Sequence, residues 1–216
     1  TTLCNYGQQN NQIITSDLNL FLQIIDEINA TTDTAAQRAI LQSGYLNKGS
    51  VGLSEIMTVR NYTENEYLNV IRNYPLFWAS LRPKMEQINT YTTQIQQNIE
   101  LLKLIYPEMK PASIYFTVGA FRTNGTTIGN HVLMGTEMCL ADTSVNISEL
   151  PEYLHPYYQS NPTAGLGLLC THEFVHTQQK EMVFNLLSLC MYEGVAEFIS
   201  SLATGQASAT PAIDFG

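Results

Sequence analysis

The chain has 216 residues, of which 44% are hydrophobic and 13% charged, and its formal net charge is −9 at pH 7. This length suits one domain, or one domain with a helical N-terminal subdomain, and the hydrophobic content is enough for a globular core. The negative charge and the lack of basic clusters argue against nucleic acid or anionic membranes as partners, and we expect no membrane-spanning segment.

The first part of the chain, residues 1–111, is predicted to be helical. Its apolar residues recur with the 3.6-residue period of helices that bury one face, and glycine or proline separates the periodic segments. The predicted helices are 17–28 with Ser16 as N-cap, 35–46, 65–81 with an interruption near Pro75, and 87–105.

The pattern changes at Ala112, where the second part of the chain, residues 112–216, begins. β-Branched and aromatic residues predict strands at 114–118 and 132–134, which we expect to form a small antiparallel sheet. Turn residues between and around these strands are Gly119, Asn124, Gly125, Gly129 and Gly135. A loop containing Pro151, Pro156 and Pro162 then leads to two predicted helices, 164–179 and 185–203, the second ended by Gly205.

The most informative segments are HEFVH at 172–176 and EGVAE at 193–197. Residues four apart share one face of a helix, so His172 and His176 can direct two imidazoles at one ion. A carboxylate from the second helix would complete three protein ligands and leave the fourth position open, as catalytic zinc requires. We therefore predict one zinc ion per chain, bound by His172, His176 and Glu193.

Two further carboxylates belong to this prediction. Glu173 projects beside the histidines, where it could act as general base toward a water activated by the metal. Glu197 lies one turn beyond Glu193 and could accept the second N–H of a ligating histidine, which would fix its tautomer. The alternatives are Glu197 as the ligand with Glu193 outside the site, or a Cys190 thiolate as the ligand.

Hydrolysis of a carbonyl compound also needs a donor for the developing oxyanion and a place for the substrate. The sequence offers Tyr192, His155, Tyr157 and Tyr158 as donors and does not choose among them. The strand residues Val132, Leu133, Met134 and Gly135 could present an edge on which an extended peptide pairs, although a purely structural strand is equally compatible. His131 beside them is expected to be a surface histidine.

The four cysteines show no C-x-x-C spacing, which argues against a structural zinc finger. Cys170 and Cys190 fall in the two helices predicted to hold the metal. A disulfide between them is possible, but we favour buried free thiols. The composition is compatible with an exported protein, and no leader is seen at the N-terminus, so we expect any targeting peptide to have been removed or left out.

The two motifs resemble those of the gluzincin metallopeptidases, in which an E-G-x-A-E helix follows H-E-x-x-H. The resemblance implies that His172, His176 and Glu193 are zinc ligands, Glu173 the general base and Glu197 the acid outside the ligand set. It also implies a mostly helical α+β fold with a zincin-like helix pair. The segments YLNKGSVGL, IRNYPLFWASLRP and IYFTVGAFRTNGTTIGNHVLMGTEM resemble predicted bacterial zinc-dependent proteases, a family of unknown function close to the gliding-motility lipoproteins of Bacteroidetes.

The chain departs from the gluzincin pattern in three ways. Sixteen residues separate His176 from Glu193, which is a short connection, and Tyr192 stands where aminopeptidases of this group carry Asn. Few residues follow the second helix, so the oxyanion donor is either absent or supplied from upstream.

We expect a zinc peptidase acting on peptides or proteins; the alternatives are an inactive metal-binding protein of envelope assembly and a hydrolase of non-peptide amides. The oligomeric state is not predicted.

Overall fold

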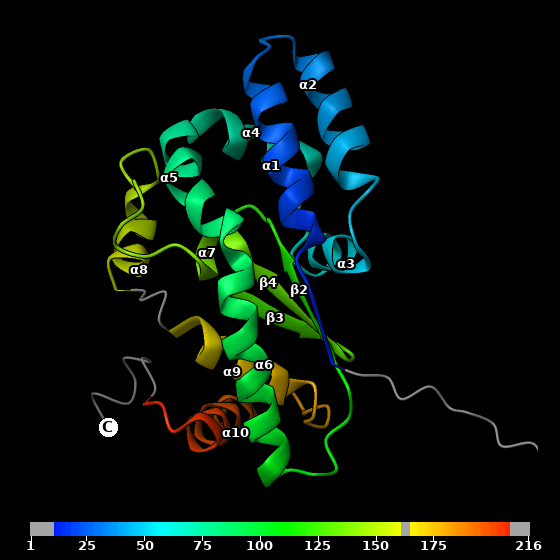
Figure 1. Cartoon of the computed structure of the whole chain (residues 1–216), viewed down its shortest axis with the longest axis vertical. Coiled ribbons are helices and arrows are strands. Elements are labelled where there is room, and N and C mark those ends of the chain that lie inside the picture. Colours follow the sequence, from blue (N-terminus) through cyan, green and yellow to red (C-terminus); the bar gives the residue numbers. More distant parts are fainter. Residues whose placement is uncertain (1–10, 161–164, 208–216) are drawn as a thin grey trace, which may run out of the picture.

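A computed structural model describes residues 11–160 and 165–207, and within these ranges the chain is a mostly helical α+β fold (Figure 1). Its strands are β1 (Gln12–Ile14), β2 (Ser113–Thr117), β3 (Gly125–Ile128) and β4 (His131–Gly135). Its helices are α1 (Ser16–Asn29), α2 (Thr34–Leu41), the π-helical η1 (Gln42–Leu46), α3 (Val51–Val59), α4 (Glu64–Asn73), α5 (Pro75–Glu86), α6 (Ile88–Ile105), α7 (Thr136–Cys139), the 3-10 turn η2 (Glu152–Leu154), α8 (His155–Ser160), α9 (Leu166–His176) and α10 (Leu186–Thr204). The expected mostly helical α+β class is confirmed.

The sheet is mixed, so the expectation of an antiparallel sheet is wrong. The strand order is β1-β2-β4-β3, in which β1 and β4 both run parallel to β2 and only β3 is antiparallel to β4. The segment 118–124 carries the chain from the end of β2 past β4 to its far side, and a tight turn at Gly129 then returns it as β4. β4 therefore inserts between β2 and β3 instead of following a simple hairpin order.

Most predicted helices are confirmed, with local differences at their ends. Pro75 is the first residue of α5 and separates it from α4, because the residue before a proline avoids helical backbone angles. The predicted N-cap Ser16 is wrong, since Thr15 occupies the cap and makes no side-chain cap bond. Instead, Asp17 of α1 accepts hydrogen bonds from the Ser50 backbone N–H and hydroxyl at 2.8 and 2.6 Å, which ties α1 to the start of α3.

Six elements were not predicted from the sequence: β1, β3, α3, α7, η2 and α8. β1 and β3 are too short to show a period-2 pattern, and their pairing with β2 and β4 decides their conformation. The predicted helix 164–179 appears as α9, while Pro162 and Ala164 lie outside the described residues. One hydrophobic core includes side chains from both 1–111 and 112–216, and β1 from the first part pairs directly with β2. The two-part division remains a prediction.

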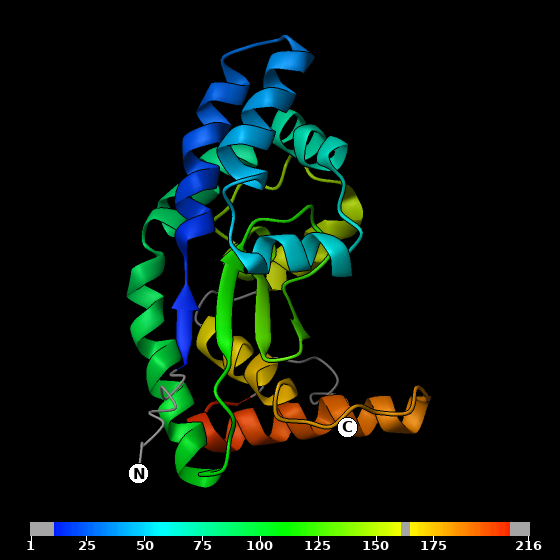
Figure 2. The same cartoon turned by 90° about the vertical axis from the view of Figure 1, so that its right-hand side faces the viewer.

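α9 and α10 lie at the end of the molecule remote from α1 and α2 (Figures 1 and 2). α9 is largely buried against α6 and β3, whereas α10 crosses this end and contacts α9 and α6 along a narrow strip. Its N-cap is Asn185, whose side chain accepts the Ser188 N–H, and it ends at Gly205 in the left-handed conformation. By length and apolar composition α10 could cross a membrane, which corrects the expectation that no stretch would qualify.

The loop between β2 and β3 is held by a buried carboxyl, that of Glu137. Its two oxygens accept the backbone N–H groups of Gly119 at 2.9 Å and Phe121 at 3.0 Å, and Phe121 takes a left-handed φ of 62°. Burial raises the pKa of Glu137 to about 7 despite these hydrogen bonds. The loop that leads to β3 is thus attached to a group that titrates near neutral pH.

This predicts that the Glu137 contribution to stability is lost as pH rises from about 4.5 to about 7. In that window the folded protein keeps the Glu137 proton and the unfolded chain loses it, so the Glu137 contribution to the free energy of unfolding falls by about 3 kcal/mol and is level above pH 7. Urea unfolding in the presence of a chelator at pH 5 and pH 7.5 measures the difference. Glu137→Gln should lack this component, whereas other titrating groups, including Glu173, are common to both proteins and cancel. Equal pH dependence in the two proteins would contradict the assignment.

Candidate metal centre

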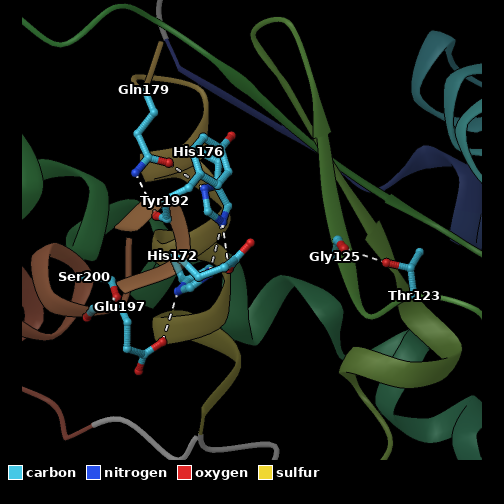
Figure 3. Close-up of polar contacts among 9 residues, drawn as sticks. Thr123, Gly125, His172, His176, Gln179, Tyr192, Glu197 and Ser200 are labelled. Atoms are coloured by element: carbon cyan, nitrogen blue, oxygen red, sulfur yellow. Dashed lines mark hydrogen bonds and ion pairs between the residues drawn. The ribbon is translucent and has the colours of Figure 1, made fainter. Parts of the chain in front are cut away.

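The two histidines of the first motif lie one turn apart on the face of α9 that meets α10 (Figure 3). The other sides of α9 are buried, with Cys170, Thr171 and Phe174 fully inside the protein, so the helix cannot rotate freely. On α10, the small residues Ala196 and Ser200 are the buried ones, and their size lets the two helices approach closely. Glu193 thereby comes opposite the histidines.

Three potential ligand atoms converge at this point. The His172 Nε2 and His176 Nε2 atoms are 3.1 Å apart, and Glu193 Oε2 lies 3.3 Å from the first and 3.4 Å from the second. Ligands about 2.0–2.1 Å from a tetrahedral zinc ion lie roughly 3.3 Å from one another, so the three separations fit one such ion. Among the described residues these three side chains form a group able to hold a metal ion.

The second nitrogen of each imidazole already has an acceptor. His172 Nδ1 lies 3.1 Å from Glu197 Oε2, and His176 Nδ1 lies 2.6 Å from Gln179 Oε1. When each Nδ1 carries the proton and donates a hydrogen bond to its acceptor, each neutral ring has an unprotonated Nε2 with a free lone pair. Two lone pairs and a carboxylate oxygen within 3.4 Å repel one another unless a cation lies between them. The donor set therefore fits a divalent metal such as zinc.

Further contacts orient His176. Gln179, which follows α9, donates its amide to the Tyr192 carbonyl at 2.8 Å, so its oxygen must face the imidazole. The Tyr192 ring stacks on His176 with a centroid distance of 4.3 Å and an interplanar angle of 8°. Burial, opposed by the Gln179 hydrogen bond, lowers the pKa of His176, which favours the neutral ring that a metal requires.

Glu197 and Glu193 occupy different sides of His172. Glu197 meets the Nδ1 side, away from the second histidine, whereas Glu193 meets both Nε2 atoms. This is the arrangement expected with Glu193 as ligand and Glu197 as the group that fixes the tautomer. Cys190 is exposed on α10 and lies outside the group. Cys170 and Cys190 are both free thiols, so the favoured expectation of no disulfide between them is confirmed. Cys170 is buried as expected, but the expectation that Cys190 is buried is wrong, because it is exposed. Cys4 lies outside the described residues.

Glu173 is buried on α9 beside Gly125, the first residue of β3. A Cβ atom at Gly125 would lie only 2.7 Å from Glu173 Cγ, so glycine is what allows the strand to approach the carboxyl this closely. Burial chiefly, together with the nearby Glu193 charge, raises the pKa of Glu173 to about 7, while Arg60 acts in the opposite direction. A carboxyl with such a pKa can exchange protons at neutral pH.

Of the four oxyanion-donor candidates, only Tyr192 lies at the histidine pair. His155 Nε2 is 2.9 Å from the Leu150 carbonyl, and the Tyr157 and Tyr158 hydroxyls donate to the carbonyls of Met138 and Glu137. These three side chains therefore hydrogen-bond the backbone in the region from α7 to α8 and do not reach the histidine pair. The sequence could not show which of the four candidates lies at the site, because the connection between the strands and α9 has no regular period from which side-chain directions could be predicted.

The predicted substrate edge at Val132, Leu133, Met134 and Gly135 is wrong. These residues belong to β4, whose two edges are hydrogen-bonded to β2 and β3, so no backbone group is left for a peptide. The outer strand beside α9 is β3, whose first residue, Gly125, lies against the Glu173 side chain. Figure 3 shows Gly125 and its contact with Thr123 across from the histidine pair. His131, at the start of β4, pairs with Glu55 at 2.8 Å and is no part of the metal group.

Three contributors were missed from the sequence: Gln179, Gly125 and Arg60. Gln179 follows His176 by three residues, which is the only sequence signal that it could reach the ring. Arg60 comes from the end of α3 and donates to the Thr123 hydroxyl at 3.1 Å, and Thr123 in turn donates to the Gly125 carbonyl at 2.5 Å. These contacts join segments far apart in the chain, so local patterns carry no trace of them.

Comparison with protein-family models, with curated proteins and with solved structures found no match for this chain. Function is therefore inferred from the site residues and their geometry.

Proposed function

We propose that the protein is a zinc-dependent metallopeptidase of the gluzincin type. Three ligand atoms separated by 3.1–3.4 Å, with a buried carboxyl on the same helix, carry the proposal. His172, His176 and Glu193 would hold one zinc ion per chain. Zinc, when bound, supplies Lewis acidity that lowers the pKa of a water toward 7 and polarises the substrate carbonyl.

In this proposal Glu173 acts as the general base and then as the general acid. As carboxylate it accepts a proton from the attacking water, and as the acid it returns that proton to the departing amine. Burial of the carboxyl raises its pKa, which helps the protonated form to persist long enough to donate to the amine. Glu197 and Gln179 keep His172 and His176 neutral and oriented, so that their Nε2 atoms stay directed at the metal.

Substrate binding is proposed at the outer edge of β3. Among the described residues this strand pairs with β4 alone, and its first residue, Gly125, lies directly against Glu173. An extended peptide that pairs with this edge would pass beside the general base. Tyr192 hydrogen-bonds the Thr127 side chain of the same strand and lies over His176, which makes its hydroxyl the first candidate for the oxyanion donor.

The proposal is tested by loading the purified protein with zinc and offering it a mixed peptide library that includes peptides blocked at either end. We expect one equivalent of zinc, and cleavage that stops when a chelator removes the metal. The blocked peptides distinguish internal cleavage from removal of terminal residues. One equivalent of zinc without cleavage of any peptide would overturn the peptidase proposal and favour a metal-binding protein without activity.

The roles of the two α10 carboxylates predict unequal effects on zinc affinity. Glu193→Gln removes one of three protein ligands, and affinity should fall on the order of 10³-fold. Glu197→Gln removes only the acceptor of the His172 Nδ1 proton, and affinity should fall by about 10- to 100-fold. Competition with a chromophoric chelator measures both constants. The reverse order would show that Glu197, and not Glu193, binds the metal.

A further inference from the structure

The outward face of α10 is apolar, and no other element of the described ranges 11–160 and 165–207 covers it. Its large side chains keep most of their surface exposed, including Leu187 at 73%, Met191 at 60%, Phe198 at 64% and Leu202 at 57%. The helix lies across the end of the molecule, so this face points away from α6 and α9 (Figure 2). Soluble proteins seldom leave such a continuous stripe open to water, and stripes of this kind usually mark an interaction surface.

Six of the exposed residues of α10 lie on its outward face and are spaced symmetrically along the helix. The stripe, called the α10 seam below, consists of Leu187, Met191, Gly194, Val195, Phe198 and Leu202. The intervals between successive seam residues are four, three, one, three and four residues. These intervals place all six residues on one face of the helix, and their order is the same from either end. The midpoint lies between Gly194 and Val195.

This symmetry is what an antiparallel pair of identical helices needs. In such a pair, residues equally distant from the midpoint face each other across the two-fold axis. Leu187 of one copy then meets Leu202 of the other, Met191 meets Phe198, and Gly194 meets Val195. Each contact joins apolar partners, and large side chains face large ones at both ends.

Gly194 at the midpoint supports a close approach there. Glycine inside a helix costs about 1 kcal/mol relative to alanine. A Cβ atom at Gly194 would have no other atom within 4 Å, so no contact in the described part of the chain requires glycine at this position. A second helix crossing at Gly194 could come nearer than it could over a larger side chain.

The lack of charge on the α10 seam and the area that it would bury are both consistent with a second copy of the chain as its partner. The seam contains no charged residue, although the chain has a net charge of −9, so pairing brings no like charges into direct contact. Glu193 and Glu197 lie off the seam, on the side that faces α9. Burying the seam on both copies would remove roughly 1,000 Å² from water, which is near the lower limit for a specific interface, so we expect a reversible dimer.

We propose that two copies of this chain pair through the α10 seam, with the two helices antiparallel about a two-fold axis between Gly194 and Val195. The pairing covers the exposed face of the helix that carries Glu193 and leaves the contacts of Glu193 with the histidines in place. It needs no metal and no catalytic activity.

Sedimentation equilibrium between about 1 and 100 µM tests the pairing. We expect a reversible monomer–dimer equilibrium for the unaltered protein and a monomer for Phe198→Glu, which places a carboxylate opposite Met191. Leu104→Glu is the matched control, because Leu104 is 77% exposed on α6 and lies off the seam. Far-ultraviolet circular dichroism confirms that each variant folds. A monomer at every concentration, or a dimer unaffected by Phe198→Glu, would overturn the proposal.

Cysteine cross-linking tests the register. In a Cys190→Ser background, Leu187→Cys and Leu202→Cys proteins should form a mixed disulfide dimer when combined, and each should cross-link poorly alone. Equal cross-linking of either variant with itself would exclude the antiparallel register. Flotation of the unaltered protein with phosphatidylcholine vesicles, together with a monomer in solution, would assign the seam to a lipid surface instead and also overturn the proposal.

Discussion

Replacing Glu173 by Gln is expected to abolish peptide hydrolysis while zinc stays bound at one equivalent per chain. The amide keeps nearly the same volume and fits beside Gly125, but it cannot accept the proton of the attacking water. General base catalysis contributes about 10²- to 10⁴-fold to such reactions, so kcat should fall by roughly 10³-fold with little change in KM. Rates on the best peptide of the library, with metal analysis of the same sample, measure both outcomes.

Glu108→Gln is a suitable control for this experiment. Glu108 is exposed in the connection after α6, so the same chemical change there should leave kcat unaltered. If Glu173→Gln retains more than about a tenth of the activity, another group activates the water and the assigned role of Glu173 is wrong. If the variant loses its zinc, the carboxyl contributes to the metal group itself.

Replacing His176 by Ala is expected to have the largest effect on metal binding. The change removes one of two imidazoles, its stacking on Tyr192 and its hydrogen bond to Gln179. Zinc affinity should fall by at least about 10³-fold. At a metal concentration 1,000 times the original dissociation constant, this removes about 4 kcal/mol of ligand-dependent stabilisation. Thermal unfolding with zinc and with a chelator should therefore give nearly the same Tm in the variant and clearly different values in the unaltered protein.

His131→Ala provides the matched comparison. His131 pairs with Glu55 at the start of β4 and is no part of the metal group, so its variant should keep the full zinc-dependent shift in Tm. A shift that survives in His176→Ala would place the ion elsewhere. A shift lost in both variants would point to a general effect of zinc on the fold.

Several features could be predicted because their causes are local in the chain. The spacing of His172 and His176 places them on one helical face whatever surrounds the helix, and Pro75 and Gly205 mark helix boundaries through their own backbone preferences. The position of Glu193 opposite the histidines also agrees with the expectation from its motif, since α10 follows α9 after a short connection. Periodicity over ten or more residues likewise located the long helices.

Other features depend on contacts between distant segments, and the sequence does not reveal them. β4 lies inside the sheet because the segment 118–124 carries β3 past it, which moves the open edge from β4 to β3. Gln179 reaches His176 only because Tyr192 of α10 holds its amide. The carboxyl of Glu173 owes its raised pKa to burial beneath Gly125 of β3.

The amino-acid sequence alone determined which side chains could bind a metal, because helical geometry converts a spacing of four residues into a shared face. Only the tertiary structure decided which nitrogen of each imidazole is free, which strand is open beside the base, and which face of α10 is left uncovered. Those properties arise from pairing and burial among segments that lie far apart in the chain, where hydrogen-bond partners and solvent exposure are set by the fold as a whole.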